Sequence, residues 1–408
     1  MTWWLCCGDS RDVLRGLETS SVDSAVCDPP YELGFMGRRW DSSGIAYSVE
    51  MWTEVLRVLK PGGHLLAFGG TRTYHRMACA IEDAGFEVRD SIHWISGSGF
   101  PKSLDVSKAI DKVNGHWRGR TGEKFSENCS MSSVNYWRTD KGDPATEAAK
   151  QWAGWGTALK PAHEPIVVAR KPLDVTVAAN VLAHGTGAIN VDATRVGYAS
   201  ESDRAKVAAS VESMKQRDGT MANSWKNSSD LSGANDASTI GRWPPNILLS
   251  HAPDCGDECA EGCAVAEMDE QSGTLKSGCK IGGSYGRIAG IHHGGQRTDG
   301  VACYADTGGA SRFFPVFRYQ AKASRADRGE GNTHPTVKPI ELMQWLVRLV
   351  TPPGGLVLDP FAGSGSTGIA ALREGFRFAG VELLPEHYEI ALARIAAAKP
   401  KMRQADLF

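Results

Sequence analysis

Strand-like and helix-like segments alternate at both ends of this 408-residue chain, and a long irregular stretch separates the two ends. Such alternation is typical of a parallel β-sheet covered by helices. The expected strands fall near residues 24–27, 64–68, 88–95, 356–358 and 376–381, and the C-terminal helices at 366–373 and 385–396. We therefore predict an α/β fold, a doubly wound, mostly parallel, Rossmann-like sheet with a long irregular insertion.

The expected domain boundaries follow the change in regularity. Residues 1–99 should form one half of the core, residues 100–311 an insertion, and residues 312–408 the other half. A strand-like run near 165–169 lies inside the insertion and is expected to return to the sheet. The 45 Lys and Arg residues nearly balance 47 Asp and Glu residues, for a net charge of −2. This balance excludes a polycation that grips phosphate over its whole surface.

The sequence also indicates where the protein works. No apolar run approaches the ~20 residues that a membrane span needs, and the first residues lack the regions of a signal peptide. We expect a cytoplasmic protein with no membrane partner. Ten cysteines are too few for a disulfide scaffold in a chain of this length, so we expect reduced thiols, with metal binding open for any that cluster.

A glycine-rich turn follows the first of the C-terminal strands. Gly363, Gly365 and Gly368 fit the G-x-G-x-x-G pattern, which serves any cofactor that approaches a helix N-terminus closely. Asp359, just before the glycines, would repel a pyrophosphate but could hold an ammonium group. Glu382 ends the next strand, where it could accept hydrogen bonds from a ribose diol. An amino acid fused to a nucleoside fits both acids, which predicts S-adenosylmethionine over a nicotinamide cofactor. The alternative is a turn without a ligand.

The tetrapeptide Asp28-Pro29-Pro30-Tyr31 follows another expected strand. Its prolines fix φ and lack N–H donors, so a carboxylate and a carbonyl could together accept both N–H bonds of an amine. Tyr31 offers a flat face on which a planar base could stack. Hydrogen bonds from both N–H groups would favour a pyramidal nitrogen, which could attack the sulfonium methyl in line. An amine inside a duplex would first have to be flipped out. The alternative is a rigid turn in which Asp28 caps a helix.

These two motifs together resemble the amino-methylating DNA methyltransferases of prokaryotes and their phages. The catalytic motif precedes the cofactor motif, as in the beta group, whose target recognition segment lies between them. Cys7-Gly8-Asp9, Leu59 to Gly63 and His334 to Pro339 are similar to further elements of the family. The resemblance implies the methyltransferase form of the Rossmann-like sheet, with S-adenosylmethionine as cofactor and double-stranded DNA as partner.

The resemblance also implies roles for individual residues. Asp28, Pro29, Pro30 and Tyr31 would be catalytic. Asp9 would accept from the adenine amine of the cofactor, Thr336 or Lys338 would meet its carboxylate, and Glu382 would bind its ribose. The remaining expected cofactor residues are Asp359, Pro360, Phe361, Gly363 and Gly365.

The target of methylation has two candidates. Asp at the first position of the catalytic motif is the usual choice of adenine-N6 enzymes, whereas Ser is commoner in cytosine-N4 enzymes, so Asp28 favours adenine. A DNA-binding protein of the same fold without catalysis is the alternative from another class. An enzyme of a restriction–modification system is the expected setting. A homodimer is an option for such a chain, and no motif identifies a partner nuclease.

Two basic stretches are candidate contacts to DNA phosphates. Residues Phe100 to Phe125 carry a net charge of +3 and residues Ser311 to Lys338 a net charge of +4. Solvated loops are the alternative. Aromatic residues that could stack on bases or simply pack lie at Trp117, Tyr136, Trp137, Trp152 and Trp155.

A last motif combines three cysteines with a histidine. His251, Cys255, Cys259 and Cys263 recur every four residues and would supply a complete tetrahedral set of zinc ligands. An irregular, glycine-rich insertion is where such a metal would help folding. The spacing also describes one face of a helix carrying ordinary thiols, and Gly256 and Gly262 make that helix less comfortable.

Overall fold

The computed structural model describes residues 2–34, 39–96, 103–116, 120–124, 137–139, 143–198, 200–215, 241–252, 255–256, 258–276, 307–317 and 337–398. The chain forms two compact units. One unit comprises Met1–Ser98 together with His163–Phe408, and the other comprises Gly99–Ala162. The second unit is therefore shorter than the 100–311 insertion expected from the sequence, because the chain rejoins the sheet at His163.

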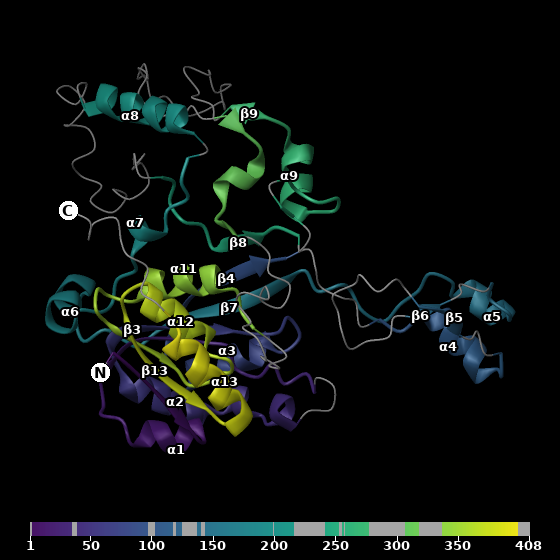
Figure 1. The fold of residues 1–408 in the computed structure, drawn as a ribbon, viewed down its shortest axis with the longest axis horizontal. Coiled ribbons are helices and arrows are strands. Elements are labelled where there is room, and N and C mark those ends of the chain that lie inside the picture. Colours follow the sequence, from purple (N-terminus) through teal and green to yellow (C-terminus); the bar gives the residue numbers. More distant parts are fainter. Residues whose placement is uncertain are drawn as a thin grey trace, which may run out of the picture. The chain divides into compact units, whose positions relative to one another are not determined.

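A nine-stranded sheet forms the centre of the larger unit (Figure 1). In spatial order its strands are β1 (Trp3–Cys7), β13 (Arg377–Glu382), β12 (Leu356–Asp359), β2 (Val22–Cys27), β3 (Leu59–Phe68), β7 (His163–Arg170), β4 (Glu87–Ile95), β8 (Ile247–Ser250) and β11 (Val316–Phe317). Strands from the two ends of the chain meet where β12 pairs with β2 in parallel.

The sheet is parallel except at β7. This strand runs antiparallel to both of its neighbours, pairing Phe68 of β3 with Ile166 and Trp94 of β4 with Glu164. The other neighbouring pairs are parallel. The amino end of β7 therefore lies at the same edge as the carboxyl ends of the other strands. This mostly parallel sheet confirms the predicted α/β fold.

Helices cover both faces of the sheet. On one face, α11 (Ile340–Val350), α12 (Ser366–Arg373) and α13 (Pro385–Ala396) supply a buried core together with Val26 and Leu66. On the other face, α1 (Ser10–Arg15), α2 (Val49–Val58) and α3 (Tyr74–Asp83) bury residues such as Trp52 against Ala25 and Leu65. Neighbouring strand residues thus face opposite cores, which explains why these strands read as continuous apolar runs.

The smaller unit contains four regular elements among its described residues. They are α4 (Val106–Val113), β5 (Arg120–Lys124), β6 (Trp137–Thr139) and α5 (Glu147–Gln151), with β5 and β6 paired antiparallel. Buried Asp111 accepts hydrogen bonds from the backbone N–H of Ala145 and of Thr146 at 3.0 and 3.1 Å. This carboxylate holds α4 to the start of α5.

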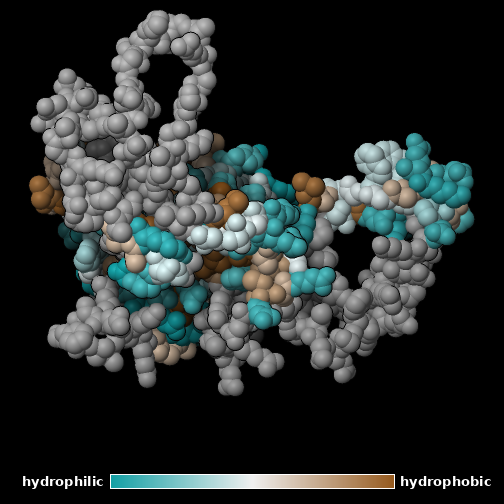
Figure 2. All heavy atoms as spheres, turned by 90° about the horizontal axis from the view of Figure 1, so that it is seen from above, coloured by the Kyte–Doolittle hydropathy of each residue, from teal (hydrophilic) through white to brown (hydrophobic). Residues whose placement is uncertain are grey.

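The remaining elements of the larger unit are mostly short, apart from the 15-residue helix α8. They are α6 (Val177–His184), α7 (Val191–Thr194), α8 (Glu201–Lys215), α9 (Ala264–Ser272), the strands β9 (Leu275–Lys276) and β10 (Thr307–Gly308), and the 3₁₀ turns η2 (Arg39–Ser42), η3 (Ile45–Tyr47) and η4 (Ala310–Phe313). On the face drawn in Figure 2, the described residues show only small apolar patches among hydrophilic ones. None of the helices in the described ranges is long and apolar enough to cross a membrane.

Candidate functional site

Three of the predicted acids lie at the carboxyl ends of neighbouring strands. Glu382 ends β13, Asp359 ends β12, and Asp28 directly follows β2. These strands are adjacent in the order β13, β12, β2, and all are parallel. Ligands of open α/β sheets bind at this edge. The topology therefore brings Asp28 to the same edge as Asp359 and Glu382, which lie more than three hundred residues later in the sequence.

A buried lysine joins the catalytic motif. Lys338 Nζ donates to Asp28 Oδ2 at 2.6 Å and to the Tyr31 hydroxyl at 3.1 Å. It also lies 3.3 Å from Glu164 Oε2, which accepts a hydrogen bond from the Tyr31 hydroxyl at 2.7 Å. We call Asp28, Tyr31, Glu164 and Lys338 the catalytic cluster. We expected Lys338 near a cofactor carboxylate, whereas the structure places it on the catalytic motif.

The surroundings of Lys338 keep it charged. The residue is only 8% exposed, and its ammonium lies 5.2 Å from the ring centre of Tyr31 and 4.8 Å from that of Phe68. Burial lowers the pKa of Lys338, but the carboxylates of Asp28 and Glu164 more than compensate, so the pKa lies above its ordinary value. Burial and the same two carboxylates raise the pKa of Tyr31 well above its usual range. At neutral pH the cluster therefore holds an ammonium ion and an un-ionised phenol.

Asp28 has one oxygen committed and one free. Its Oδ2 binds Lys338, whereas its Oδ1 is buried and has no hydrogen-bond partner among the residues that the structure describes. The Tyr31 carbonyl accepts a hydrogen bond from Thr73 Oγ1 at 2.7 Å, which fixes the end of the motif. Glu32, the next residue, has φ of 54°, a left-handed conformation that costs a non-glycine residue about 1–2 kcal/mol. The backbone turns sharply after Tyr31. Within this motif, Asp28 Oδ1 could receive a hydrogen bond from a ligand.

The glycine-rich turn is built around Glu382. Gly363 N–H donates to Glu382 Oε2 at 2.8 Å, and Leu384 N–H donates to Oε1 at 2.9 Å. A carboxylate offers about four lone-pair sites, so two remain for a ligand such as a diol. Gly363 and Gly365 have φ of 52° and 81°, which few other residues adopt. A Cβ on Gly365 would lie 2.9 Å from the side chain of Ile395, so packing as well as the turn requires glycine there.

Asp359 is an unusual acid in this turn. It is buried, its Oδ1 accepts from Phe361 N–H at 2.9 Å, and the Thr367 side chain also donates to it. Burial raises its pKa to about 7, and the negative charges of Asp28 and Glu382 add to the effect against the two hydrogen bonds. A cation beside Asp359 would favour its ionised form. The site therefore suits an ammonium group.

The structure places the other expected cofactor residues with more local partners. Asp9 caps α1 by accepting from Arg11 N–H at 2.9 Å, and it forms an ion pair with the Arg11 guanidinium at 2.6 Å. The hydrogen bond from Arg11 holds the pKa of Asp9 below its ordinary value. The Pro360 carbonyl accepts from Ser10 Oγ at 2.5 Å, and the Phe361 ring lies 6.1 Å from that of Trp52. Thr336 lies outside the described residues.

Sequence reasoning missed three residues of this site. Glu164 belongs to the catalytic cluster, Thr73 holds the Tyr31 carbonyl, and Thr367 donates to Asp359. Glu164 immediately precedes the run 165–169 that we expected to be a strand. An antiparallel direction for that strand would have placed Glu164 at the catalytic edge. The position of Glu164 beside a predicted strand was visible in the sequence, but the direction of a strand in its sheet cannot be read from its own residues.

The structure brings the four predicted metal ligands together. One ligand atom from each of His251, Cys255, Cys259 and Cys263 lies within 4.8 Å of the others. Of the predicted base-stacking aromatics, Trp152 and Trp155 are exposed and lie edge to face at 4.9 Å between ring centres. Trp117, Tyr136 and much of the two basic stretches lie outside the described residues.

Comparisons with known proteins identify the family of this chain. The family model N6_N4_Mtase, described as DNA methylase, matches residues 22–393. Two Escherichia coli (strain K12) proteins are similar over short segments. "Putative methylase YubD" is 48% identical over 71 residues, which are 17% of this chain and 31% of that protein. "DNA adenine methyltransferase YhdJ" is 41% identical over 69 residues, which are 17% of this chain and 24% of that protein.

The matched segments thus span less than a third of either relative. Among solved structures, the cytosine-N4-specific PvuII DNA methyltransferase is 15% identical with a TM-score of 0.43, over 100% of this chain and 90% of that one. The family match covers most of the chain, from the strand before Asp28 to the helix after Glu382. This chain therefore belongs to the DNA methylase family.

Proposed function

We propose that the protein is an S-adenosylmethionine-dependent DNA methyltransferase that modifies the exocyclic N6 amine of a flipped adenine within a specific sequence. The observation that carries this proposal is Asp28. Its Oδ2 is held by a charged lysine while its buried Oδ1 has no partner in the described part of the chain. A buried acceptor without a donor costs free energy. An amine N–H of the substrate would supply that donor.

The residues at the sheet edge fit S-adenosylmethionine. Glu382 keeps two lone-pair sites for a ribose diol, and Asp359 offers a carboxylate to the ammonium of an amino acid. When bound, this cofactor supplies an electrophilic methyl group. Asp28 directly follows β2, which pairs with β12, and Asp359 ends β12. Neighbouring strands are about 4.8 Å apart, so the base amine and the amino-acid part of the cofactor would be neighbours.

The catalytic cluster then prepares the amine. Asp28 Oδ1 and the Pro29 carbonyl accept its two N–H bonds, which turns the nitrogen lone pair towards the methyl group. Lys338 fixes the plane of the Asp28 carboxylate through its hydrogen bond to Oδ2. The phenol of Tyr31 is held by Lys338 and Glu164, which orients its ring for stacking on the base. The nitrogen loses a proton after methylation, and Asp28 is the carboxylate already in contact with it.

Two further observations support DNA as the partner. The stretch Phe100 to Phe125 carries a net charge of +3, and phosphate contacts need such charge. The smaller unit also exposes the edge-to-face pair Trp152 and Trp155, whose rings could stack on bases. We infer that this unit takes part in target recognition.

Adenine is favoured over cytosine N4 as the target. The first residue of the motif is Asp28, the choice that the resemblance associates with adenine-N6 enzymes. The relative YhdJ, which is 41% identical over its matched segment, is a DNA adenine methyltransferase. Both observations point to the same base, and the product of the reaction tests them.

The test is to incubate the full chain with unmethylated DNA and S-adenosylmethionine, digest the DNA and identify the modified nucleoside by mass spectrometry. We expect N6-methyladenine. N4-methylcytosine would replace the proposed base, and bound cofactor without any product on varied DNA would leave a DNA-binding protein without catalysis.

The matched variants are Asp28→Ala and Asp12→Ala, the second of which removes an exposed carboxylate paired only with Arg15. Asp28→Ala should lower turnover by about 10³-fold or more while cofactor binding persists, since a preorganised polar contact contributes on that scale. Asp12→Ala should keep full turnover. Activity that survives in Asp28→Ala would refute the mechanism.

A further inference from the structure

The side chains of His251, Cys255, Cys259 and Cys263, here called the thiol cluster, lie close together, and none of them enters the mechanism of methyl transfer proposed above. His251 directly follows β8, and Cys263 is the residue that precedes α9. The described residues between Ser250 and Ala264 form no helix. The four-residue spacing is therefore not the face of a helix, and the side chains converge for another reason.

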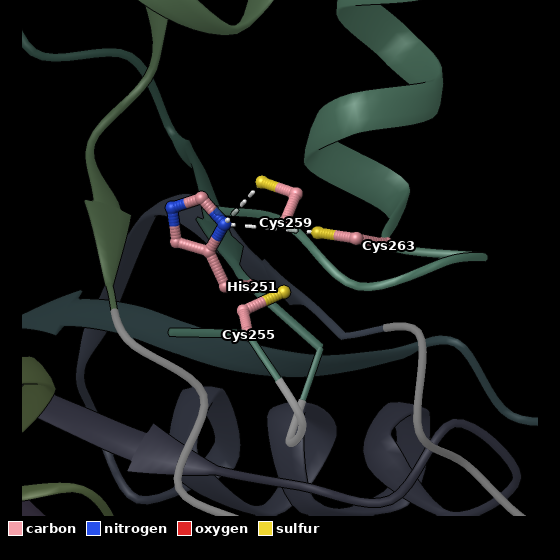
Figure 3. Close-up of side chains that lie close together, drawn as sticks. All are labelled: His251, Cys255, Cys259 and Cys263. Carbon is pink, nitrogen blue, oxygen red and sulfur yellow. Dashed lines mark hydrogen bonds between the residues drawn. The ribbon is translucent and has the colours of Figure 1, made fainter. Parts of the chain in front are cut away.

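The side chains point towards a common centre (Figure 3). His251 Nδ1 lies 3.4 Å from Cys259 Sγ and 3.6 Å from Cys263 Sγ. Zinc bonds to sulfur and imidazole nitrogen are about 2.3 and 2.0–2.1 Å long, so tetrahedral angles separate the two atoms by about 3.6 Å. The observed separations match this value. All four ligand atoms also lie within 4.8 Å of one another, so a closure of about 1 Å would bring the widest pair to the tetrahedral sulfur–sulfur separation of about 3.8 Å.

The chemistry of the donors selects the metal. Thiolate and imidazole ligands in a tetrahedral arrangement are typical of zinc, whereas calcium and magnesium take oxygen ligands. Four protein ligands leave no position for substrate or water, which is the pattern of a structural centre. Ala260 N–H donates to Cys255 Sγ at 3.2 Å, and such backbone donors stabilise a metal-bound thiolate. We propose that the thiol cluster binds one structural zinc ion.

The thiol cluster would stabilise a part of the fold that has little core of its own. Among the described residues, the local hydrophobic cluster has three buried members, Leu249, Cys263 and Val265, and partly buried side chains pack against them. A core of this size cannot order a long irregular segment by apolar burial alone. Zinc would join the end of β8 to the start of α9 and so order the segment between them.

This segment is tied to the sheet at a second point. Asp269 of α9 accepts from the backbone N–H and the hydroxyl of Ser311, both at 2.7 Å, and Ser272 Oγ accepts from Ala310 N–H at 2.9 Å. Ser311 and Ala310 belong to η4, which leads into β11 beside β8. The zinc centre would therefore fix α9 at the sheet edge that also carries Asp28, because β8 and β2 run in the same direction.

The direct test is metal analysis of the full chain, purified under reducing conditions from cells supplied with zinc. We expect one zinc ion per chain by plasma mass spectrometry. Cys259→Ser should lose this zinc, whereas Cys79→Ser, which alters an exposed cysteine on α3, should retain it. No zinc in the unaltered chain, or equal zinc in both variants, would overturn the proposal. A disulfide between cluster cysteines that persists after purification under reducing conditions would also overturn it.

A second measurement keeps the test independent of folding failure. Replacing zinc by Co²⁺ should give the absorption of tetrahedral cobalt with thiolate ligands. His251→Cys should keep the metal, because four thiolates also form a tetrahedral zinc site, and should strengthen the sulfur-to-cobalt charge-transfer band. A cobalt spectrum unchanged by this substitution would exclude His251 as a ligand. Methyl transfer is not the readout in either measurement.

Discussion

The catalytic cluster and the thiol cluster lie at the same edge of the sheet, and different interactions hold each of them together. The catalytic cluster surrounds a cation of the protein itself, since Lys338 contacts both Asp28 and Glu164. In the described part of the chain, the hydrogen bonds of the thiol cluster join thiols, His251 and backbone amides, with no ammonium among them. The catalytic cluster thus contains its own cation, whereas the thiol cluster would receive one from the zinc ion proposed above.

The two clusters also differ in the sequence separation of their residues. Lys338 and Asp28 are 310 positions apart, and the strands of the sheet align them. The thiol cluster spans only residues 251–263 and follows a four-residue strand. A long-range site can rely on a large shared core, while a local site in an irregular segment needs its own cross-link. Three predictions examine this contrast.

The largest effect should follow from removing the cation of the catalytic cluster. Lys338→Met leaves Asp28 and Glu164 without their shared ammonium, and uncovering a buried charge in this way costs about 3–5 kcal/mol of stability. Urea denaturation measures the change. Arg15→Met, which breaks exposed pairs with Asp12 and Glu50, should cost less than about 1 kcal/mol.

Adding Glu164→Gln to Lys338→Met should recover part of the lost stability, because the double variant has one fewer carboxylate without a cationic partner. If Lys338→Met cost no more than Arg15→Met, the lysine would not be the element that holds this cluster together.

A smaller loss of stability should distinguish the glycine-rich turn at Gly365 from the backbone beside the thiol cluster. Gly365→Ala forces a side chain into φ of 81° and brings its Cβ to 2.9 Å from Ile395, so we expect a loss of about 1–3 kcal/mol in unfolding free energy. Gly256→Ala, beside the thiol cluster, meets no atom within 4 Å and should change stability by no more than about 0.5 kcal/mol. Thermal and urea unfolding of both variants test the difference. Equal losses would mean that the two turns are equally constrained.

The smallest effect concerns pH at the cofactor edge. Burial raises the pKa of Asp359 to about 7, so this acid gains its charge only as the pH rises through that value. If the ionised form binds the ammonium of S-adenosylmethionine, affinity should fall by up to about tenfold from pH 8 to pH 6. Calorimetric titration of the full chain measures it. Asp359→Asn should bind more weakly and lose this pH dependence, and an unaltered dependence in that variant would assign the titration to another group.

Local signals predicted the C-terminal elements well. The helices at 366–373 and 385–396 have the expected bounds, because Gly365 and Pro385 mark their first turns. Helix α11 was not among the predicted elements, although Glu341, Gln344 and Arg348 recur at helical spacing along a segment that is otherwise mostly buried. The turn expected at Lys60 to Gly63 lies within β3, where Gly62 N–H donates to the Lys171 carbonyl at 3.1 Å. This hydrogen bond joins residues more than a hundred positions apart, so the local sequence alone could not predict it.

Sequence reasoning alone predicted the alternation of strands and helices, the acids at three strand ends and the set of four candidate metal ligands, because each depends on neighbouring residues. Only the tertiary structure decided that β7 runs antiparallel and that Lys338 lies on Asp28. Strand direction and pairing depend on the packing of the whole sheet, and an ion pair across 310 positions depends on both. The role of Lys338 and the presence of Glu164 in the site follow from that packing alone.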